Sequence, residues 1–360
     1  MKVSTSRQPL LRLACALALA TTTGGLAPAM LAQAKQAPAQ KLDAEYTAKI
    51  KAATPDARIL TELVDHLPAS DRVPTPLKFL GYIPGEPGKL TYYKDIVRYL
   101  DAVDKASDRV TMFKIGVSDE GRDMFAIAIA DEATIKNIDK YRKITEQLTD
   151  PRKLSDEQAK QLIATGKPIY FATGSIHSPE TGSPEMLMEL AYRLAVEETP
   201  FIQTIRNNSI VVLNPASEVD GREKVVDNFR AQQAGKPQPS MVYWGKYVQH
   251  DNNRDGIGVG LRLTQVMLKT FLDWHPTVFH DLHESATLLY TSTGTGPYFT
   301  AVDPIQISEW WLLAQTEVME MTKRNVPGVW TYNYYDGWVP NYMFWIGVTH
   351  NSIGRFYETQ

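Results

Sequence analysis

The sequence predicts a single α/β domain whose mixed, mostly parallel, twisted sheet carries helices on both faces. Short apolar, β-branched runs alternate along the chain with longer segments whose apolar residues recur at helical spacing. Such alternation is typical of parallel strands joined by helices that cover the sheet. The composition, 43% hydrophobic and 22% charged over 360 residues, is that of a globular protein and suits one large domain.

The predicted elements follow one another from about residue 91. A helix with one apolar face precedes two strands, at 110–117 and 124–130, whose polar connecting turn indicates a hairpin. After a helix at 157–164 come two apolar strands, at 169–173 and 209–213. The second half contains an amphipathic helix, a strand, another helix and a final extended segment, at 261–274, 277–283, 308–324 and 348–360.

The N-terminus has the pattern of a secretory signal peptide. Three basic residues precede a short apolar core at 13–20, and small residues follow up to Ala34, after which we expect cleavage. The apolar core is too short to favour a membrane anchor instead. The prediction is therefore a signal peptide over 1–34, a flexible or extended leader over 35–75, and a folded domain over 76–360.

Export to the periplasm or the medium follows from this signal, with no membrane span left after cleavage. The single cysteine, Cys15, lies inside the signal peptide, so a metal site of the exported protein cannot use thiolate ligands. The net charge of −3 lacks the basic excess of nucleic-acid-binding proteins, and no nucleic-acid partner is predicted.

The most informative stretch runs from Tyr170 to Glu185. An apolar strand breaks at Gly174 into a polar turn, and a helix begins near Pro184. His177 and Glu180 lie three residues apart in this turn. An imidazole and a carboxylate from one turn can share a zinc ion, and catalytic zinc keeps one position open for water. A solvated histidine and a glutamate at a helix start would give the same pattern.

Other polar residues follow the ends of predicted strands, where ligands bind in sheets of this kind. Asn214-Pro215 closes one strand, and His283 ends another. His280 is the alternative to His283 as a third ligand; strand alternation puts the two on opposite faces. We favour His283, because it lies at the strand end, and expect Asp281 or Glu284 to orient a ligand imidazole. For Glu284, a solvent-facing charge is the simpler interpretation.

With these motifs in order, the chain resembles the carboxypeptidase A-like zinc carboxypeptidases from about Thr91 to its end. The motifs are His177-Ser-Pro-Glu180, Asn253-Arg254, His283 and Glu358. The resemblance implies a zinc carboxypeptidase fold in which His177, Glu180 and His283 bind one Zn²⁺. It also implies that Asn253 and Arg254 bind the terminal carboxylate of a peptide, while Glu358 acts as general base on a zinc-bound water.

Two further substrate contacts come from the same resemblance. An arginine that stabilises the oxyanion is expected after Asn214-Pro215, and Arg222 and Arg230 are both available. A substrate tyrosine is expected in the aromatic stretch 329–344, where Tyr332, Tyr334 and Tyr335 are available and we take Tyr335. A place in the core or in the wall of a cleft is the more common role of such aromatic residues. The structural alternatives are that Arg254 pairs with Asp251 or Asp255, and Glu358 with Arg355.

The function predicted from the sequence is therefore an exported zinc metallocarboxypeptidase that removes a C-terminal residue. One alternative is a zinc amidase or deacylase of the same fold, acting on cell-wall peptides or acylated amino acids. The other is a binding protein that keeps the fold without catalysis. The family domain continues with a closing helix where this sequence ends, two residues after Glu358, so we expect the chain to be truncated.

Overall fold

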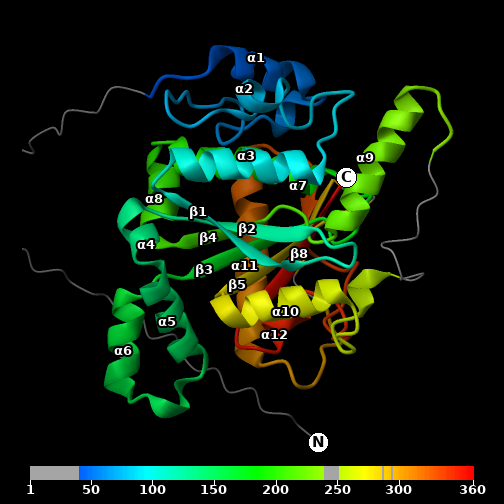
Figure 1. Ribbon diagram of the computed structural model, residues 1–360. Helices are drawn as coiled ribbons and strands as arrows, with labels where there is room; N and C mark the ends of the chain where they lie inside the picture. Colours follow the sequence, from blue (N-terminus) through cyan, green and yellow to red (C-terminus); the bar gives the residue numbers. More distant parts are fainter. Residues whose placement is uncertain (1–39, 239–250, 286–287, 293–294) are drawn as a thin grey trace, which may run out of the picture. The chain divides into compact units, whose positions relative to one another are not determined.

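The computed structural model describes residues 40–238, 251–285, 288–292 and 295–360. The predicted signal peptide, 1–34, lies outside these ranges. Over the described residues the chain builds one mixed sheet of eight strands, in the order β1-β2-β4-β3-β5-β8-β6-β7 (Figure 1). The strands are β1 Val110–Val117, β2 Asp123–Ile129, β3 Ile169–Gly174, β4 Ile210–Asn214, β5 Val278–Glu284, β6 Leu289–Thr291, β7 Val329–Trp330 and β8 Ile353–Thr359.

The centre of the sheet is parallel. Strands β4, β3, β5 and β8 all run in one direction. Strand β2 pairs antiparallel with β1 and β4, β6 pairs antiparallel with β8, and β7 runs parallel to β6. The carboxyl ends of the four central strands therefore meet at one edge. The register places His283 of β5 beside Glu358 of β8, and Thr173 of β3 beside Asp281. Side chains that follow these strand ends are brought together there.

Helices cover both faces, because each central strand is apolar on both sides. On β3, Ala172 packs into one core cluster and Phe171 into the other. Helices α3 (Tyr93–Ala106) and α7 (Gly182–Val196) pack in the first cluster, and α10 (Arg262–Trp274) packs in the second (Figure 1). The predicted α/β class with a mixed, mostly parallel sheet is confirmed.

The remaining helices lie around this frame. They are α2 Pro76–Leu80, α4 Glu132–Lys136, α5 Ile138–Thr149, α6 Asp156–Thr165, α8 Pro200–Asn208, α9 Val219–Gln233, α11 Pro304–Lys323 and α12 Trp345–Val348, with short 3-10 turns η1 Ala57–Ile59, η2 Pro151–Lys153 and η3 Asn252–Arg254. Within the described residues, none of these helices combines the length and the apolar character that a bilayer span requires.

The prediction of a flexible or extended leader over 35–75 is wrong for its described part. Residues 40–75 contain helix α1 (Ala44–Ala53), and their side chains join the core of α3 and α7. Tyr46 and Leu67 are fully buried, and the Tyr46 hydroxyl donates to Glu189 of α7 at 2.9 Å. The Ala- and Lys-rich composition hid a few large apolar residues that bury enough surface to order the segment.

A third core cluster is aromatic and lies beside β8. Trp310 of α11, Trp345 of α12 and Phe344 pack against Phe356 of β8 and Tyr290 of β6. This cluster packs against β8, the strand that carries Glu358, so it fixes one wall of the site described next.

Candidate active site

The first two candidate ligands come from the turn between β3 and α7. Ser175 has a left-handed backbone with φ of 51°, which turns the chain sharply as it leaves the strand. The backbone N–H of Ser175 donates to Ser183 at the start of α7. His177 and Glu180 thereby face the same side of the turn, and the Nδ1 of His177 lies 2.6 Å from Glu180 Oε1.

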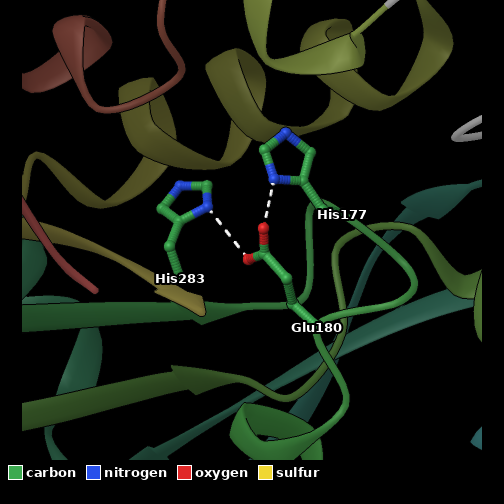
Figure 2. A group of neighbouring side chains, drawn as sticks. All are labelled: His177, Glu180 and His283. Carbon is green, nitrogen blue, oxygen red and sulfur yellow. Dashed lines mark hydrogen bonds and ion pairs between the residues drawn. The ribbon is translucent and has the colours of Figure 1, made fainter. Parts of the chain in front are cut away.

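The third candidate ligand comes from the end of β5. The Nδ1 of His283 lies 3.0 Å from Glu180 Oε2, so the carboxylate of Glu180 stands between the two imidazoles (Figure 2). One ligand atom from each of His177, Glu180 and His283 lies within 4.8 Å of the other two. Two nitrogens and a carboxylate oxygen converging in this way form the donor set of a zinc site.

Each imidazole is held on its far side by a second carboxylate. The Nε2 of His177 lies 2.8 Å from Asp251 Oδ1, and the Nε2 of His283 lies 2.8 Å from Asp281 Oδ2. Thr173 donates its hydroxyl to the other oxygen of Asp281 at 3.0 Å. These contacts leave both Nδ1 atoms aimed at Glu180, which is the arrangement a shared cation needs.

His280, the alternative to His283, lies on the opposite face of β5. Its Nδ1 is 2.6 Å from the hydroxyl of Tyr170, and burial lowers the pKa of its imidazole well below the usual value. The side chain therefore belongs to the core on the α7 side, away from Glu180. Strand alternation separated the two histidines as the sequence predicted.

The charged groups of this cluster change one another's pKa values. Burial would raise the pKa of Glu180, but contacts with His177 and His283 outweigh it and lower that pKa to about 2. Burial opposes protonation of both imidazoles, yet their carboxylate partners raise the pKa of each above its usual value. The cluster thus attracts cations strongly, and a proton competes with a metal for it.

Glu358 faces the same space from the neighbouring strand. Its Oε2 is buried and has no hydrogen-bond partner among the described residues. Burial, together with the charge of Glu180, raises its pKa to about 7 despite the opposing influence of His283. A carboxylate with this pKa beside a cation site is suited to accept and return protons near neutral pH.

A cavity of about 350 Å³ opens over these residues. Five aromatic side chains form its walls, and the polar lining consists of candidate ligands and nearby groups. The lining residues are His177, Asn253, Arg254, His283, Tyr334, Tyr335, Tyr342, Phe344, Phe356 and Glu358. All but one of the predicted site residues therefore line this cavity or contact its imidazoles, the exception being Arg222.

Asn253 and Arg254 reach the cavity from η3. The Asn253 amide lies 3.2 Å from the Nε2 of His283 and accepts the backbone N–H of Met343, so it is largely engaged within the protein. Arg254 lies over the ring of Tyr342, pairs with Asp251 at 3.0 Å and stays 41% exposed. Arg254 also lines the cavity, and a guanidinium offers five N–H donors in a fixed plane.

Asp255, considered above as a partner for Arg254, has another role. Its carboxylate accepts the backbone N–H groups of Gly260 and Leu261 at 3.0 and 2.8 Å, where α10 begins. The carboxylate that pairs with Arg254 is Asp251, which also holds His177.

The prediction that Arg222 contacts substrate is wrong. Its guanidinium is fully buried, bonded to the Glu185 carboxylate and to the carbonyl oxygens of Thr91 and Thr181. A buried charge left without partners would be strongly destabilising, so Arg222 is fixed there by Glu185. Arg230 lies over the ring of Tyr92, away from the cavity lining.

Tyr335 lines the cavity but is a fixed wall. Its hydroxyl accepts the indole N–H of Trp345 at 3.0 Å, and its ring contacts Phe356 at 4.9 Å between centroids. Tyr334 is 56% exposed at the rim, and both it and Asn333 have left-handed backbones with φ of 68° and 67°. The hydroxyl of Tyr334 donates to that of Ser285 at 3.3 Å, and its ring contacts Tyr290 and Trp330, so the protein holds this side chain as well.

The solvent-facing interpretation of Glu284 is also wrong. Its carboxylate accepts the backbone N–H of Gly182. Burial raises the pKa of the Glu284 carboxyl above its usual value, although contacts with the N–H groups of Gly182, Ser183 and Thr181 oppose this rise. It therefore caps the first turn of α7, where a negative charge is stabilising.

Asp251 is the functional residue that the sequence did not single out, since it was considered only as a partner of Arg254. The signal was its position two residues before Asn253 in a loop already assigned to the site. The residues present fit a zinc ion, because two imidazoles and one carboxylate converge and both imidazoles are held by outer carboxylates. A buried oxygen of Glu358 also has no hydrogen-bond partner within the part of the chain that the structure describes.

Residues 96–260 match the zinc carboxypeptidase family. Among solved structures, the chain is similar to a candidate carboxypeptidase A from Shewanella denitrificans, with a TM-score of 0.51 and 13% identity over 75% of this chain and 61% of the other. The chain is also similar to a metallo-carboxypeptidase from Burkholderia cenocepacia, with a TM-score of 0.50 and 13% identity over 75% of this chain and 60% of the other. The chain thus spans about three fifths of these structures. No curated protein matches it.

Proposed function

We propose that this chain, which the match over residues 96–260 assigns to the zinc carboxypeptidase family, is a zinc-dependent enzyme that hydrolyses the C-terminal bond of peptides. The observation that carries the proposal is the convergence of His177, Glu180 and His283 beside a cavity that Glu358 also lines. The Oε2 of Glu358 has no hydrogen-bond partner among the residues that the structure describes. Ligands, a proton acceptor and an open space for substrate lie together there.

His177 and His283, through their Nδ1 atoms, and Glu180 would hold the zinc. A zinc ion in such a site lowers the pKa of a bound water to about 7 and polarises a carbonyl group. Glu358 accepts the proton of the attacking water on its unpartnered Oε2 and returns it to the nitrogen of the departing residue. Arg254 donates hydrogen bonds to the terminal carboxylate of the peptide, and Tyr334, which lines the cavity, contacts the peptide from the rim.

The central test is Glu358→Gln. The amide keeps the shape of the side chain but cannot accept the water proton, so kcat should fall by about 10³-fold or more while zinc stays bound. Elemental analysis measures the zinc content, and hydrolysis of a blocked dipeptide measures kcat. A variant that keeps wild-type turnover would remove Glu358 from the mechanism, and a wild-type protein without stoichiometric zinc would remove the metal.

One observation favours the second candidate, a zinc amidase or deacylase. Arg254 is partly neutralised by Asp251 at 3.0 Å, which weakens its attraction for a terminal carboxylate. Paired peptides with free and amidated C-termini distinguish the two. The carboxypeptidase requires the free carboxylate, so equal rates on both members of a pair would favour the amidase.

Export is part of the same proposal. The basic residues, apolar core and small residues of 1–34 support cleavage after Ala34 and a periplasmic or secreted enzyme. Mass spectrometry of the protein recovered from the periplasm and medium of an expressing bacterium would test it. We expect a mature N-terminus at residue 35; an intact N-terminus in the cytoplasm would contradict export.

A further inference from the structure

Helix α7 begins without a capping group of its own, although it follows closely after the candidate ligand Glu180. The residue at its N-cap position, Thr181, makes no side-chain hydrogen bond to the first turn. The acidic residue of that turn, Glu185, is engaged elsewhere, since its carboxylate accepts the N–H and the hydroxyl of Thr91 and pairs with Arg222. The first N–H groups of a helix need acceptors, so here an acceptor has to come from another element.

The acceptor is Glu284, the residue that follows the candidate ligand His283 on β5. Its carboxylate accepts the backbone N–H of Gly182, the first residue of α7. The N–H groups of Ser183 and Thr181 also stabilise this carboxylate. A negative charge is favourable at this end of a helix, where the N–H groups carry partial positive charge. The cap of α7 is therefore a tertiary contact between a strand end and a helix start.

The main chain of Glu284 makes a second contact with the same turn. Its N–H donates to the Oε2 of Glu180 at 3.1 Å. The same oxygen lies 3.0 Å from the Nδ1 of His283 (Figure 2). Glu284 thus contacts the ligand turn at two points, the carboxylate of Glu180 and the peptide group of Gly182. It joins the strand that carries one imidazole to the turn that carries the other imidazole and the carboxylate.

The carboxylate of Glu284 fits closely against α7. A Cβ at residue 182 would lie 2.4 Å from its Oε1, so the glycine there allows the carboxylate to reach the backbone. Burial raises the pKa of the Glu284 carboxyl, and the charge of Glu180 adds to this rise. Both effects disfavour a carboxylate at this place. The hydrogen bonds to α7 are therefore what keeps it there.

The position of the ligand turn relative to β5 has few other determinants. Strands β3 and β5 are paired up to Gly174 and Leu282, where the chain leaves β3 and enters the turn. Among the described residues of β5, His283 and Glu284 are the ones whose hydrogen bonds reach the turn beyond this point. Zinc holds nitrogen and oxygen ligands at about 2.0 to 2.2 Å, so ligands from two segments must be placed accurately.

We infer that Glu284 is a positioning residue of the candidate metal site, which holds the first turn of α7 against β5 and so keeps the Glu180 carboxylate beside the imidazole of His283. The inference rests on the proposed zinc-dependent function, and it adds to that function a residue that acts through the ligands. Groups that orient metal ligands change metal affinity by about 10- to 100-fold when they are removed.

Three variants separate hydrogen bonding from charge and from helix capping in general. Glu284→Ala removes the acceptor, Glu284→Gln keeps an amide oxygen that can accept the Gly182 N–H, and Ser155→Ala removes the N-cap of α6 as the matched control. In competition with a chromogenic chelator, Glu284→Ala should bind zinc about 10- to 100-fold more weakly, and the other two within about threefold of wild type. Affinity of Glu284→Ala within twofold of wild type would overturn the inference, as would equal losses in Glu284→Ala and Glu284→Gln.

Cobalt(II) in place of zinc reports on the arrangement of the ligands. Its visible absorption depends on ligand number and geometry, which a loss of helix stability alone does not change. We expect the cobalt-saturated Glu284→Ala protein to have a spectrum different from that of wild type, and Glu284→Gln and Ser155→Ala to keep the wild-type spectrum. A wild-type spectrum in Glu284→Ala would contradict the positioning role.

Gly182→Ala tests the same contact from the side of the helix. The new Cβ would displace the Glu284 carboxylate, so zinc affinity should fall as in Glu284→Ala. The double variant should bind zinc no more weakly than Glu284→Ala, whereas fully additive losses would overturn the inference. Urea unfolding checks that each variant is folded. If Glu284→Ala is not, Gly182→Ala replaces it, since alanine favours a helix more than glycine does.

Hydrolysis of blocked dipeptides by the same proteins separates this inference from the proposed function. A wild-type protein whose zinc affinity depends on Glu284 but which cleaves no peptide supports the inference and contradicts the carboxypeptidase proposal. A protein that cleaves peptides while its zinc affinity is independent of Glu284 contradicts the inference alone. A wild-type protein that binds neither zinc nor cobalt overturns both.

Discussion

At the scale of single residues, the site is built from carboxylates as much as from histidines. Glu180 lies between two imidazoles, and Asp251 and Asp281 hold the opposite nitrogens of those rings. Without Asp251 and Asp281, each ring could rotate or carry its proton on the nitrogen that faces Glu180. The outer carboxylates therefore decide whether the two histidines can act as ligands.

The role of Asp281 can be measured through zinc affinity. Asp281→Asn keeps the size of a fully buried side chain but removes its charge, so the Nε2 proton of His283 is held less firmly. We expect zinc to bind about 10- to 100-fold more weakly, measured by competition with a chromogenic chelator. Asp303→Asn, which changes the N-cap of α11, is the matched control. Affinity within twofold of wild type would contradict the assignment.

Glu358 should also make the metal-free protein sensitive to alkali. Burial raises its pKa to about 7, above an unfolded value of 4.5. A group with a raised native pKa stabilises the fold fully below the unfolded pKa, and that contribution is lost as pH rises through the native pKa. In the presence of a chelator, the unfolding free energy of the wild type should therefore fall by about 1–3 kcal/mol relative to that of Glu358→Gln between pH 5 and pH 8.5.

Urea unfolding of both proteins across this pH range measures the difference. A constant difference between wild type and Glu358→Gln would mean that the carboxyl group titrates alike in the folded and unfolded states. Zinc should reduce the effect, since a nearby cation favours the ionised carboxylate.

At the scale of elements, the ligand turn depends on how closely α9 approaches it. Ser178 lies between the candidate ligands His177 and Glu180, and it is fully buried against Gly221 in the first turn of α9. A Cβ at residue 221 would stand 1.7 Å from the Ser178 Oγ and 2.6 Å from its Cβ. Only a glycine at this position allows the helix and the turn to pack.

Gly221→Ala should therefore push the ligand turn out of place. We expect a loss of about 1–3 kcal/mol in unfolding free energy, with weaker zinc binding, and partial rescue of both by a second change, Ser178→Gly. Gly260→Ala is the control, because a Cβ there would meet Asp255 at an ordinary 3.6 Å. Gly221→Ala with wild-type zinc affinity would show that the turn adjusts freely.

At the scale of the whole described unit, residues 40–75 belong to the fold although the family match begins only at residue 96. Beyond the contact between Tyr46 and Glu189, the Tyr192 hydroxyl donates to the carbonyl oxygen of Pro68 at 2.8 Å. The segment therefore supports α7, the helix whose first turn follows the candidate ligand Glu180.

Two leucines of this segment distinguish a core element from a leader. Leu67→Ala removes a fully buried side chain and should lower the unfolding free energy by about 2–5 kcal/mol. Leu42→Ala changes a side chain that is 45% exposed, and it should alter the unfolding free energy by no more than about 0.5 kcal/mol. Urea unfolding measures both, and equal small effects would restore the interpretation of a loosely attached leader.

Much of the fold followed from periodicity. The hairpin of β1 and β2, the parallel strands β3, β4 and β5, and the helices α10 and α11 appear close to where apolar spacing predicted them. The leader failed because its few large apolar residues have no regular spacing. Their burial depends on α3 and α7, which come later in the chain. Composition cannot show that a distant helix will supply the other half of a contact.

The candidate ligands were found from local spacing combined with strand ends, and the structure brings His177, Glu180 and His283 together. Arg222 was misjudged because sequence order shows only that an arginine is available. Its pairing with Glu185 joins residues that are far apart in the chain, and burial then removes the guanidinium from the cavity. The sequence around Arg222 does not indicate that its side chain pairs with Glu185 or that it is buried.

The sequence by itself determined the class of fold and the residue types that can bind zinc, since both depend on patterns within one strand, helix or turn. Only the tertiary structure decided that Asp251 holds His177, that Asp281 rather than Glu284 holds His283, and that five aromatic rings line the cavity. The contact between Asp251 and His177 and the assembly of the rings depend on packing between segments that are distant in the chain, for which the sequence carries no local signal.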